Sequence, residues 1–200
     1  MSAPFGSDRR LVVATLNRAK GRELVRLLGD LPWAITLFAD VPDARLPDET
    51  GATYAENALI KARTVASVTR LTALGDDSGL EVDALGGKPG LRSARFGGPG
   101  LDDATRTALL LERLRDVPDE RRTARFVCVI ALVDDVGRER VVEASVDGRI
   151  THEPRGHGGF GYDPVFFYPP LGRTFAELSA DEKSNVDHRG GAVRALRRLL

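Results

Sequence analysis

Residues 71–82 read LTALGDDSGLEV, and this stretch decides the fold because two adjacent carboxylates interrupt an apolar run. The apolar residues 71–75 predict a short buried strand. The four residues DDSG then predict an acidic turn, after which residues 80–85 alternate in the manner of a strand that pairs back as a hairpin arm. Side chains of adjacent strand residues point to opposite faces, so we expect Asp76 and Asp77 to have different tasks.

Apolar periodicity on both sides of this stretch predicts strands alternating with helices, followed by a β-hairpin. The helix at residues 53–69 has the strongest signal, because its apolar residues form one stripe and Thr53 with Glu56 matches a capping box. On that helix, Asn57 and Lys61 share a face, a pattern typical of solvated side chains. The other expected elements are strands at residues 11–15, 33–38, 125–133, 138–150 and 165–167, and helices after residue 20 and at residues 102–115 and 191–200. This order predicts a mixed α/β architecture and not a purely parallel one.

The composition indicates a globular chain whose charges act locally. Of its 200 residues 42% are apolar, and Lys plus Arg equal Asp plus Glu at 29 each. Zero net charge argues against duplex binding, and no apolar run approaches the roughly 20 residues of a membrane span. Residues 1–8 predict a disordered tail without a secretory signal, so we expect a cytoplasmic chain with no nucleic-acid or membrane partner. The single cysteine, Cys128, lies in an apolar run and is expected to be buried.

Residues 156–161 fit the string G-x-G-x-x-G, but their context does not fit a dinucleotide site. The last glycine is followed by Tyr162-Asp163-Pro164, which does not open a helix. The glycines would instead let the backbone approach a flat or anionic ligand. Phe160 and Tyr162 either offer aromatic faces to a nucleobase or pack into the core, and the sequence leaves both alternatives open.

The chain has no P-loop motif, so phosphate would have to be held elsewhere. Residues 15–20 lie between a predicted strand and a predicted helix, whose N-terminus offers N–H groups to an anion. Asn17 and Lys20 would add side-chain donors. An ordinary turn with Asn17 as the helix N-cap is an equal alternative.

The acidic pair has the oxygen ligands that Mg²⁺ prefers, and Asp48 with Glu49 offers a second acidic source. A plain capped turn is the alternative for the pair. Near the C-terminus, Lys183, His188 and Arg189 would form a donor-rich edge able to read carbonyl oxygens on a base.

Six segments, in order along nearly the whole chain, resemble the Ham1/RdgB-like family of inosine/xanthosine triphosphate pyrophosphatases. They are residues 14–20, 49–58, 76–82, 89–95 and 158–164, and Glu182-Lys183 through His188-Arg189. Each segment is weak by itself, but six at sensible spacing are highly specific.

The resemblance implies an α/β fold with an elongated mixed β-sheet flanked by helices, and two lobes with a central cleft. Residues 9–200 would form a single pyrophosphatase domain of two lobes, and the protein would be a homodimer. The implied activity is Mg²⁺-dependent hydrolysis of non-canonical purine nucleoside triphosphates (dITP, ITP, XTP) to the monophosphate and pyrophosphate, which clears deaminated purines from the nucleotide pool.

The resemblance also implies roles for individual residues, with Asp77 as the general base. The implied substrate-binding residues are Thr15, Leu16, Asn17, Arg18, Ala19, Lys20, Ser78, Phe160, Gly161, Tyr162, Asp163, Lys183, His188 and Arg189. The candidate metal ligands are Asp77, Asp76, Glu49 and Asp48.

Two positions depart from the family's pattern. Leu16 stands where Gly is frequent, and Asp187 stands where Ser commonly precedes the His-Arg pair. One rival is a Maf-like nucleotide pyrophosphatase, whose usual N-terminal signature carries Ser and Arg where this chain has Asn17 and Lys20. The other is a nucleotide-binding module without turnover, against which the acidic pair and Lys20 argue.

Overall fold

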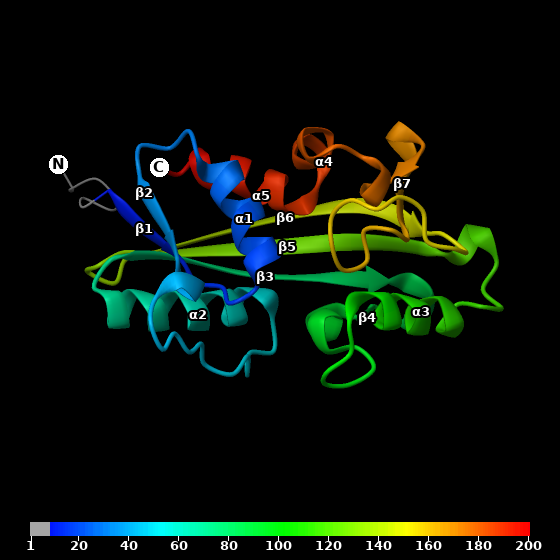
Figure 1. The fold of residues 1–200 in the computed structure, drawn as a ribbon, viewed down its shortest axis with the longest axis horizontal. Helices are drawn as coiled ribbons and strands as arrows, with labels where there is room; N and C mark the ends of the chain where they lie inside the picture. Colours follow the sequence, from blue (N-terminus) through cyan, green and yellow to red (C-terminus); the bar gives the residue numbers. More distant parts are fainter. Residues whose placement is uncertain (1–8) are drawn as a thin grey trace. The chain divides into compact units, whose positions relative to one another are not determined.

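The computed structural model describes residues 9–200, which form two compact units built from discontinuous segments (Figure 1). Unit 1 comprises the described residues up to Asp77 with Cys128–Ala144 and Arg189–Leu200, and unit 2 comprises Ser78–Val127 and Ser145–His188. Strands β3 (Thr72–Val82), β5 (Thr123–Val133) and β6 (Glu139–Ile150) each continue from one unit into the other. The predicted tail at residues 1–8 lies outside the described residues.

Unit 1 is built on parallel strands connected by helices. Strand β1 pairs in parallel with β2 and with β3. Besides its parts of β3, β5 and β6, the elements of this unit are β1 (Arg10–Val13), α1 (Arg18–Leu28), β2 (Ala34–Leu37), the short 3-10 helix η1 (Phe38–Asp40), α2 (Tyr54–Thr69) and α5 (His188–Arg197), of which His188 belongs to unit 2.

Strand residues of unit 1 alternate between two apolar clusters, as the period of two requires. Leu11 and Val13 pack with Leu24 of α1 and with residues of α5. Val12 packs in the opposite direction, with Ala62 and its neighbours on α2. Figure 1 accordingly shows α1 and α5 on one face of these strands and α2 on the other. The predicted buried cysteine, Cys128, belongs to the first cluster.

Helix α2 lies directly against β3 at Gly75. A Cβ atom at this position would lie 2.2 Å from the carbonyl oxygen of Ala58 and 2.8 Å from the backbone nitrogen of Ala62. Only glycine permits so close an approach. The approach brings Asn57 and Lys61 of α2 to the residues of β3 that follow Gly75.

Unit 2 packs short antiparallel strands around an aromatic core. Strand β4 pairs with β3, β7 with β6, and β8 with β7, all antiparallel. Besides its parts of β3, β5 and β6, the elements are η2 (Asp83–Leu85), β4 (Lys88–Pro89), η3 (Gly90–Arg95), α3 (Asp103–Arg113), η4 (Asp119–Arg121), β7 (Phe166–Tyr168), η5 (Pro169–Leu171), β8 (Arg173–Thr174), η6 (Phe175–Glu177) and α4 (Ala180–Val186). Phe126, Phe166 and Phe175 form the centre of the core, with ring centroids 4.6 Å apart for Phe126–Phe166 and 4.8 Å for Phe166–Phe175. The strand order β2-β1-β3-β5-β6-β7-β8, with β4 beside β3, confirms a mixed sheet flanked by helices.

Strand β3 corrects two predictions. Asp76-Asp77-Ser78-Gly79 is not a turn, and residues 80–82 are not a hairpin arm, because one strand runs unbroken through both. A turn would bring the carboxylates to water, but Asp76 and Asp77 are only 1% and 6% exposed. Each instead meets a lysine inside unit 1, so the extended backbone continues. The strand that pairs antiparallel with β3 is instead β4, which follows η2.

Helix boundaries also differ near both ends of the chain. Helix α1 begins at Arg18, within the segment predicted to be a turn before the helix, and ends at Leu28. Helix α4 was not predicted, although Ser179 and Glu182 form its capping box and carry that signature in the sequence. Helix α5 begins at His188, three residues before the predicted start.

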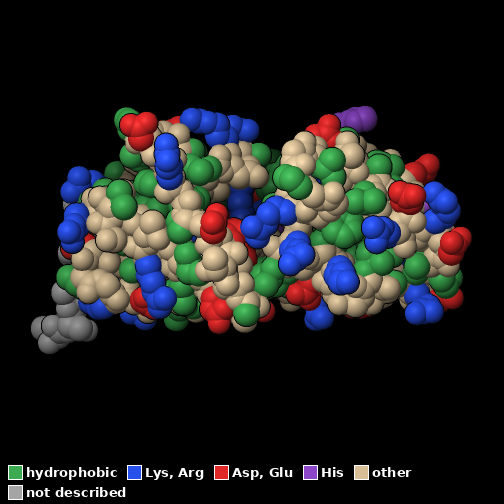
Figure 2. Space-filling model, turned by 90° about the horizontal axis from the view of Figure 1, so that it is seen from below, with side chains coloured by type: hydrophobic (Ala, Val, Ile, Leu, Met, Phe, Trp, Pro, Cys, Tyr) green, Lys and Arg blue, Asp and Glu red, His purple; other side chains and the backbone are tan. Residues whose placement is uncertain are grey.

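Basic and acidic side chains are interspersed on the face shown in Figure 2, in keeping with the neutral composition. Among the helices of residues 9–200, none is long and apolar enough to cross a membrane.

Candidate functional site

The turn between β1 and α1 is a capped helix start. The N–H of Lys20 donates to the Asn17 side-chain oxygen (3.1 Å), and the N–H of Asn17 donates to Thr15 Oγ1 (3.2 Å). Asn17 is therefore the N-cap, and this is compatible with an anion site because a cap satisfies only one of the free N–H groups. Leu16 is an exposed large hydrophobic residue in this turn.

Arg18 and Ala19 belong to the same predicted site but differ in their surroundings. The Arg18 guanidinium is exposed and donates to Asp40 at 2.8 Å and to the Ala39 carbonyl at 3.2 Å. Ala19 is half-buried and has no polar side-chain group.

Asp76 is a buried carboxylate held by cations. The Lys20 ammonium lies 2.7 Å from its Oδ2, and the Arg189 Nε lies 3.9 Å from the same oxygen. Burial would raise the pKa of Asp76, but Lys20, Lys61 and Arg189 outweigh it and hold the pKa below its ordinary value. Asp76 is thus a permanent anion at neutral pH.

Asp77 meets a different set of partners, as strand geometry predicts. Lys61 Nζ lies 3.3 Å from its Oδ1, and the Asn57 amide donates to its Oδ2 at 3.2 Å. Lys61 also donates to Glu49 at 2.8 Å. Burial raises the pKa of Asp77, and the nearby Glu49 carboxylate adds to the rise, while Lys61 and Lys20 oppose it. A raised pKa brings this carboxylate closer to the range in which a general base is efficient.

Asn57 and Lys61 were predicted as a solvated face, and this prediction is wrong. They are 1% and 5% exposed, because the close packing of α2 on β3 encloses them. Burial lowers the pKa of Lys61, but Asp76, Asp77 and Glu49 outweigh it and raise the pKa, so the side chain stays cationic. One feature of the sequence could have indicated their burial. Asn57 and Lys61 are spaced by four on a helix that is otherwise rich in alanine.

Arg189 of α5 is held by a contact with α1 that the sequence did not indicate. Its Nη1 donates to Glu23 of α1 at 2.8 Å, and both side chains are nearly buried. Arg189 therefore lies beside two carboxylates of unit 1, Glu23 and Asp76.

The four candidate metal ligands are not gathered in one cluster. Among the residues that the structure describes, no group of three or more His, Cys, Asp or Glu is placed to hold a metal ion. Glu49 and Asp77 converge on Lys61, Asp76 is paired with Lys20, and Asp48 is exposed.

In unit 2, the glycine-rich loop is ordered by a buried ion pair. Lys183 Nζ donates to Asp163 Oδ2 at 2.7 Å, and the N–H of Phe160 donates to the same oxygen at 2.9 Å. Lys183 also lies 5.2 Å from the centroid of the Phe160 ring. The loop therefore brings together three of the predicted substrate-binding residues.

The two aromatic residues of this loop take different roles. Tyr162 packs into the core and donates its hydroxyl to the Ser93 carbonyl at 2.9 Å. Burial raises the pKa of Tyr162, so the phenol stays protonated. Phe160 is only half-buried and remains the aromatic face of the loop. His188 is buried and stacks on Phe126, with centroids 4.7 Å apart. Ser78, the first residue of unit 2, is half-buried.

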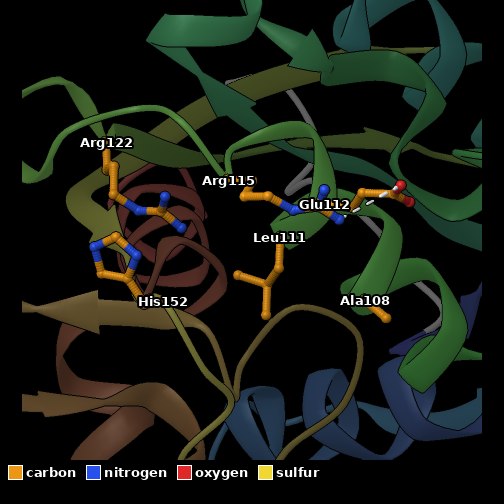
Figure 3. A pocket seen from close by; sticks show the side chains of 6 residues that line it. All are labelled: Ala108, Leu111, Glu112, Arg115, Arg122 and His152. Carbon is orange, nitrogen blue, oxygen red and sulfur yellow. Dashed lines mark ion pairs between the residues drawn. The ribbon is translucent and has the colours of Figure 1, made fainter.

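A separate pocket in unit 2 has a volume of about 410 Å³ (Figure 3). It is lined by Ala108, Leu111, Glu112, Arg115, Arg122 and His152. Arg122 is saturated by main-chain carbonyls, including those of Leu114 at 2.6 Å and Thr151 at 2.8 Å. Arg115 lies 3.8 Å from Glu112. These cations are engaged within the chain, and the lining contains none of the predicted site residues.

Comparison with known proteins shows which family this chain resembles over nearly its whole length. Residues 11–199 match the Ham1 family. The chain is 51% identical over 187 residues to a protein named dITP/XTP pyrophosphatase from Thermus thermophilus, covering 94% of this chain and 89% of that protein. A solved structure of a HAM1 protein from Coxiella burnetii is 41% identical with a TM-score of 0.85, covering 95% of this chain and 97% of that one. The structure of a nucleoside-triphosphatase, dITP/XTP pyrophosphatase, from Mycobacterium abscessus is 46% identical with a TM-score of 0.74, covering 96% and 98%.

Proposed function

The chain belongs to the Ham1 family, and from this premise we propose that it hydrolyses dITP, ITP and XTP to the monophosphate and pyrophosphate. The relatives named dITP/XTP pyrophosphatase support this substrate class. The observation that carries the proposal is the divided acidic pair, in which Asp76 is a permanent anion and Asp77 is a carboxylate of raised pKa. A hydrolase needs such a base, whereas a binding module does not.

In the proposed reaction, water attacks the α-phosphorus of the triphosphate. Asp77 accepts the proton of the water, an O–P bond forms at the α-phosphorus, and the bond to the bridging oxygen breaks so that pyrophosphate leaves. Lys61, beside Asp77, stays cationic and faces the charge that develops on the phosphoryl oxygens. Lys20 and the start of α1 bind the triphosphate, with Asp76 holding the Lys20 ammonium in place.

Glu49 and Asp77 are the two candidate ligands that could hold a divalent cation, in place of the Lys61 ammonium that they share. Glu49 and Asp77 present carboxylate oxygens to one cationic centre, and Mg²⁺ is usually held by one or two carboxylates with substrate phosphates completing its shell. Glu49 and Asp77 would hold the ion. Bound there, Mg²⁺ would supply charge neutralisation of the phosphates. Asp76 fits less well, because two cations, Lys20 and Arg189, compensate this one carboxylate, whereas Glu49 and Asp77 share the single cation Lys61.

For the base, we propose that Phe160 of unit 2 offers its ring for stacking while Lys183 and His188 of the same unit supply the donors for carbonyl oxygens. Hypoxanthine and xanthine carry a 6-carbonyl where adenine carries an amine. A donor-lined site discriminates against adenine, because its donors would be left unpaired.

We also propose that the chain acts in the cytoplasm as a homodimer and as a single pyrophosphatase domain of residues 9–200. Sedimentation at several protein concentrations tests the assembly. A monomer at all micromolar protein concentrations would refute the proposed homodimer.

The experiment that tests the function supplies ITP, XTP, ATP, GTP and the pyrimidine triphosphates separately with Mg²⁺, and quantifies monophosphate, pyrophosphate and orthophosphate. We expect IMP and XMP with stoichiometric pyrophosphate, and slower turnover of the ordinary nucleotides. Orthophosphate as the product would overturn the reaction type. Preferred turnover of pyrimidine nucleotides would favour the Maf-like alternative, and binding without turnover would favour the non-catalytic one.

A further inference from the structure

Two residues of α3 bind both backbone groups of one residue in the glycine-rich loop of unit 2. Asp103 Oδ2 accepts the N–H of Gly161 at 2.8 Å, and Thr107 Oγ1 donates to the Gly161 carbonyl at 3.3 Å. Residues 103 and 107 are four apart and therefore lie on the same face of the helix. Gly161 has a left-handed φ of 62°, which is not the extended conformation of a strand. Its backbone groups are therefore bound by side chains of α3 and not by strand pairing.

The Asp103 carboxylate is itself oriented by the helix. Its other oxygen, Oδ1, accepts from Arg106 Nη1 at 3.2 Å, and Arg106 Nη2 donates to the Leu101 carbonyl at 2.8 Å. Asp103 is not needed as the helix cap, because Asp102 is the N-cap and accepts the N–H of Thr105 at 2.8 Å. The contact from Asp103 to the loop is therefore a separate function of a second acidic residue.

The other side of the loop is held by Asp163, which accepts from Phe160 N–H and from Lys183. At Gly159, a Cβ atom would lie 2.0 Å from Asp163 Oδ2, so the loop closes tightly around this carboxylate. Phe160 is thus fixed by Asp163 through its own N–H and by α3 through Gly161.

We propose that Asp103 and Thr107 are positioning residues that hold the Phe160 ring in the orientation in which it stacks on the purine base. The inference rests on the proposed function only for the identity of the ligand. Asp103 and Thr107 act through Gly161 and do not touch the substrate. A loop pre-ordered in this way loses less entropy on binding, so its release weakens base binding and leaves the phosphate chemistry of unit 1 unchanged.

The test compares Asp103→Ala and Thr107→Val with a control on the same helix, Thr105→Val, whose side chain is exposed. Hydrogen–deuterium exchange of residues 156–163 is measured for each purified variant without nucleotide. We expect faster exchange of residues 156–163 in Asp103→Ala and in Thr107→Val, and the wild-type rate in Thr105→Val. Thermal unfolding of each variant separates a local release of the loop from general instability. Unchanged exchange in Asp103→Ala would overturn the inference.

The functional arm measures kcat and KM with ITP and with ribose 5-triphosphate, which lacks the base. For Asp103→Ala we expect KM for ITP to rise about fivefold, the equivalent of one ordinary hydrogen bond, with kcat nearly unchanged. KM for ribose 5-triphosphate should stay at the wild-type value. An equal rise for both substrates would mean that the α3 contacts serve stability alone, and would refute the positioning role. If wild-type protein turned over neither substrate, the proposed function would fail, and the exchange data would still decide whether α3 orders the loop.

Discussion

Replacing each aspartate of the acidic pair by asparagine should separate stability from catalysis. Asp76 has a lowered pKa, which means that the fold stabilises its ionised form. Asp77 has a raised pKa, which means that the fold disfavours its ionised form. Asp76→Asn should therefore destabilise the protein, and Asp77→Asn should change its stability little while reducing turnover.

The magnitudes follow from the contacts. Removing one partner of a buried ion pair costs about 3–5 kcal/mol, and we expect the lower end for Asp76→Asn because Arg189 keeps its Glu23 contact and the Lys20 side chain is 14% exposed. For a chain of this size about 3 kcal/mol lowers Tm by roughly 9 °C. Asp77→Asn leaves Lys61 paired with Glu49 at 2.8 Å, so its stability should stay within about 1 kcal/mol of wild type. Loss of a general base should reduce kcat about 10²- to 10⁴-fold.

Urea unfolding at pH 7 and pH 3, together with kcat for ITP at pH 7, provides the assay. The stability that Asp76 contributes is present above its unfolded pKa of about 4 and is lost as pH falls through the lower folded value, so the gap between wild type and Asp76→Asn should narrow towards pH 3. A larger stability loss in Asp77→Asn than in Asp76→Asn would refute the division of roles. Near-normal kcat in Asp77→Asn would remove it as the base.

Two further predictions concern the surroundings of the pair. Glu49→Gln should shift the acidic limb of the kcat/KM profile to lower pH, because Glu49 raises the pKa of Asp77. The control Asp48→Asn, at the exposed neighbouring residue, should leave the limb in place. A shift to higher pH in Glu49→Gln would contradict the assignment of Asp77 as the base. Gly75→Ala should lower the free energy of unfolding by about 3 kcal/mol in urea, since its Cβ would lie 2.2 Å from the Ala58 carbonyl oxygen. The control Gly29→Ala should be tolerated, because its Cβ would have no contact under 3.4 Å. Equal stability of the two variants would show that α2 can move away from β3.

Local signals in the sequence predicted most helices and strands, because periodicity and caps act over a few residues. The N-cap Thr53 occupies its expected place, and strands β5 and β6 begin and end within two residues of the predicted bounds. The same local reasoning failed at Asp76 and Asp77. Two carboxylates in a row are typical of a turn unless cations from other elements meet them, and that condition is not local.

By itself, the sequence determined a mixed α/β chain of the Ham1 type, the segments that carry its chemistry, and the opposite directions of the two aspartates along an extended backbone. Only the tertiary structure decided that the acidic pair lies inside β3, because Lys20, Lys61 and Arg189 come from three different helices to compensate it. The tertiary structure also shows that Lys61, which the sequence pattern places on the surface, is the buried partner of Asp77, since Gly75 lets α2 approach β3. Burial and charge at a site depend on residues far apart in the chain, and these set the different pKa shifts of Asp76 and Asp77.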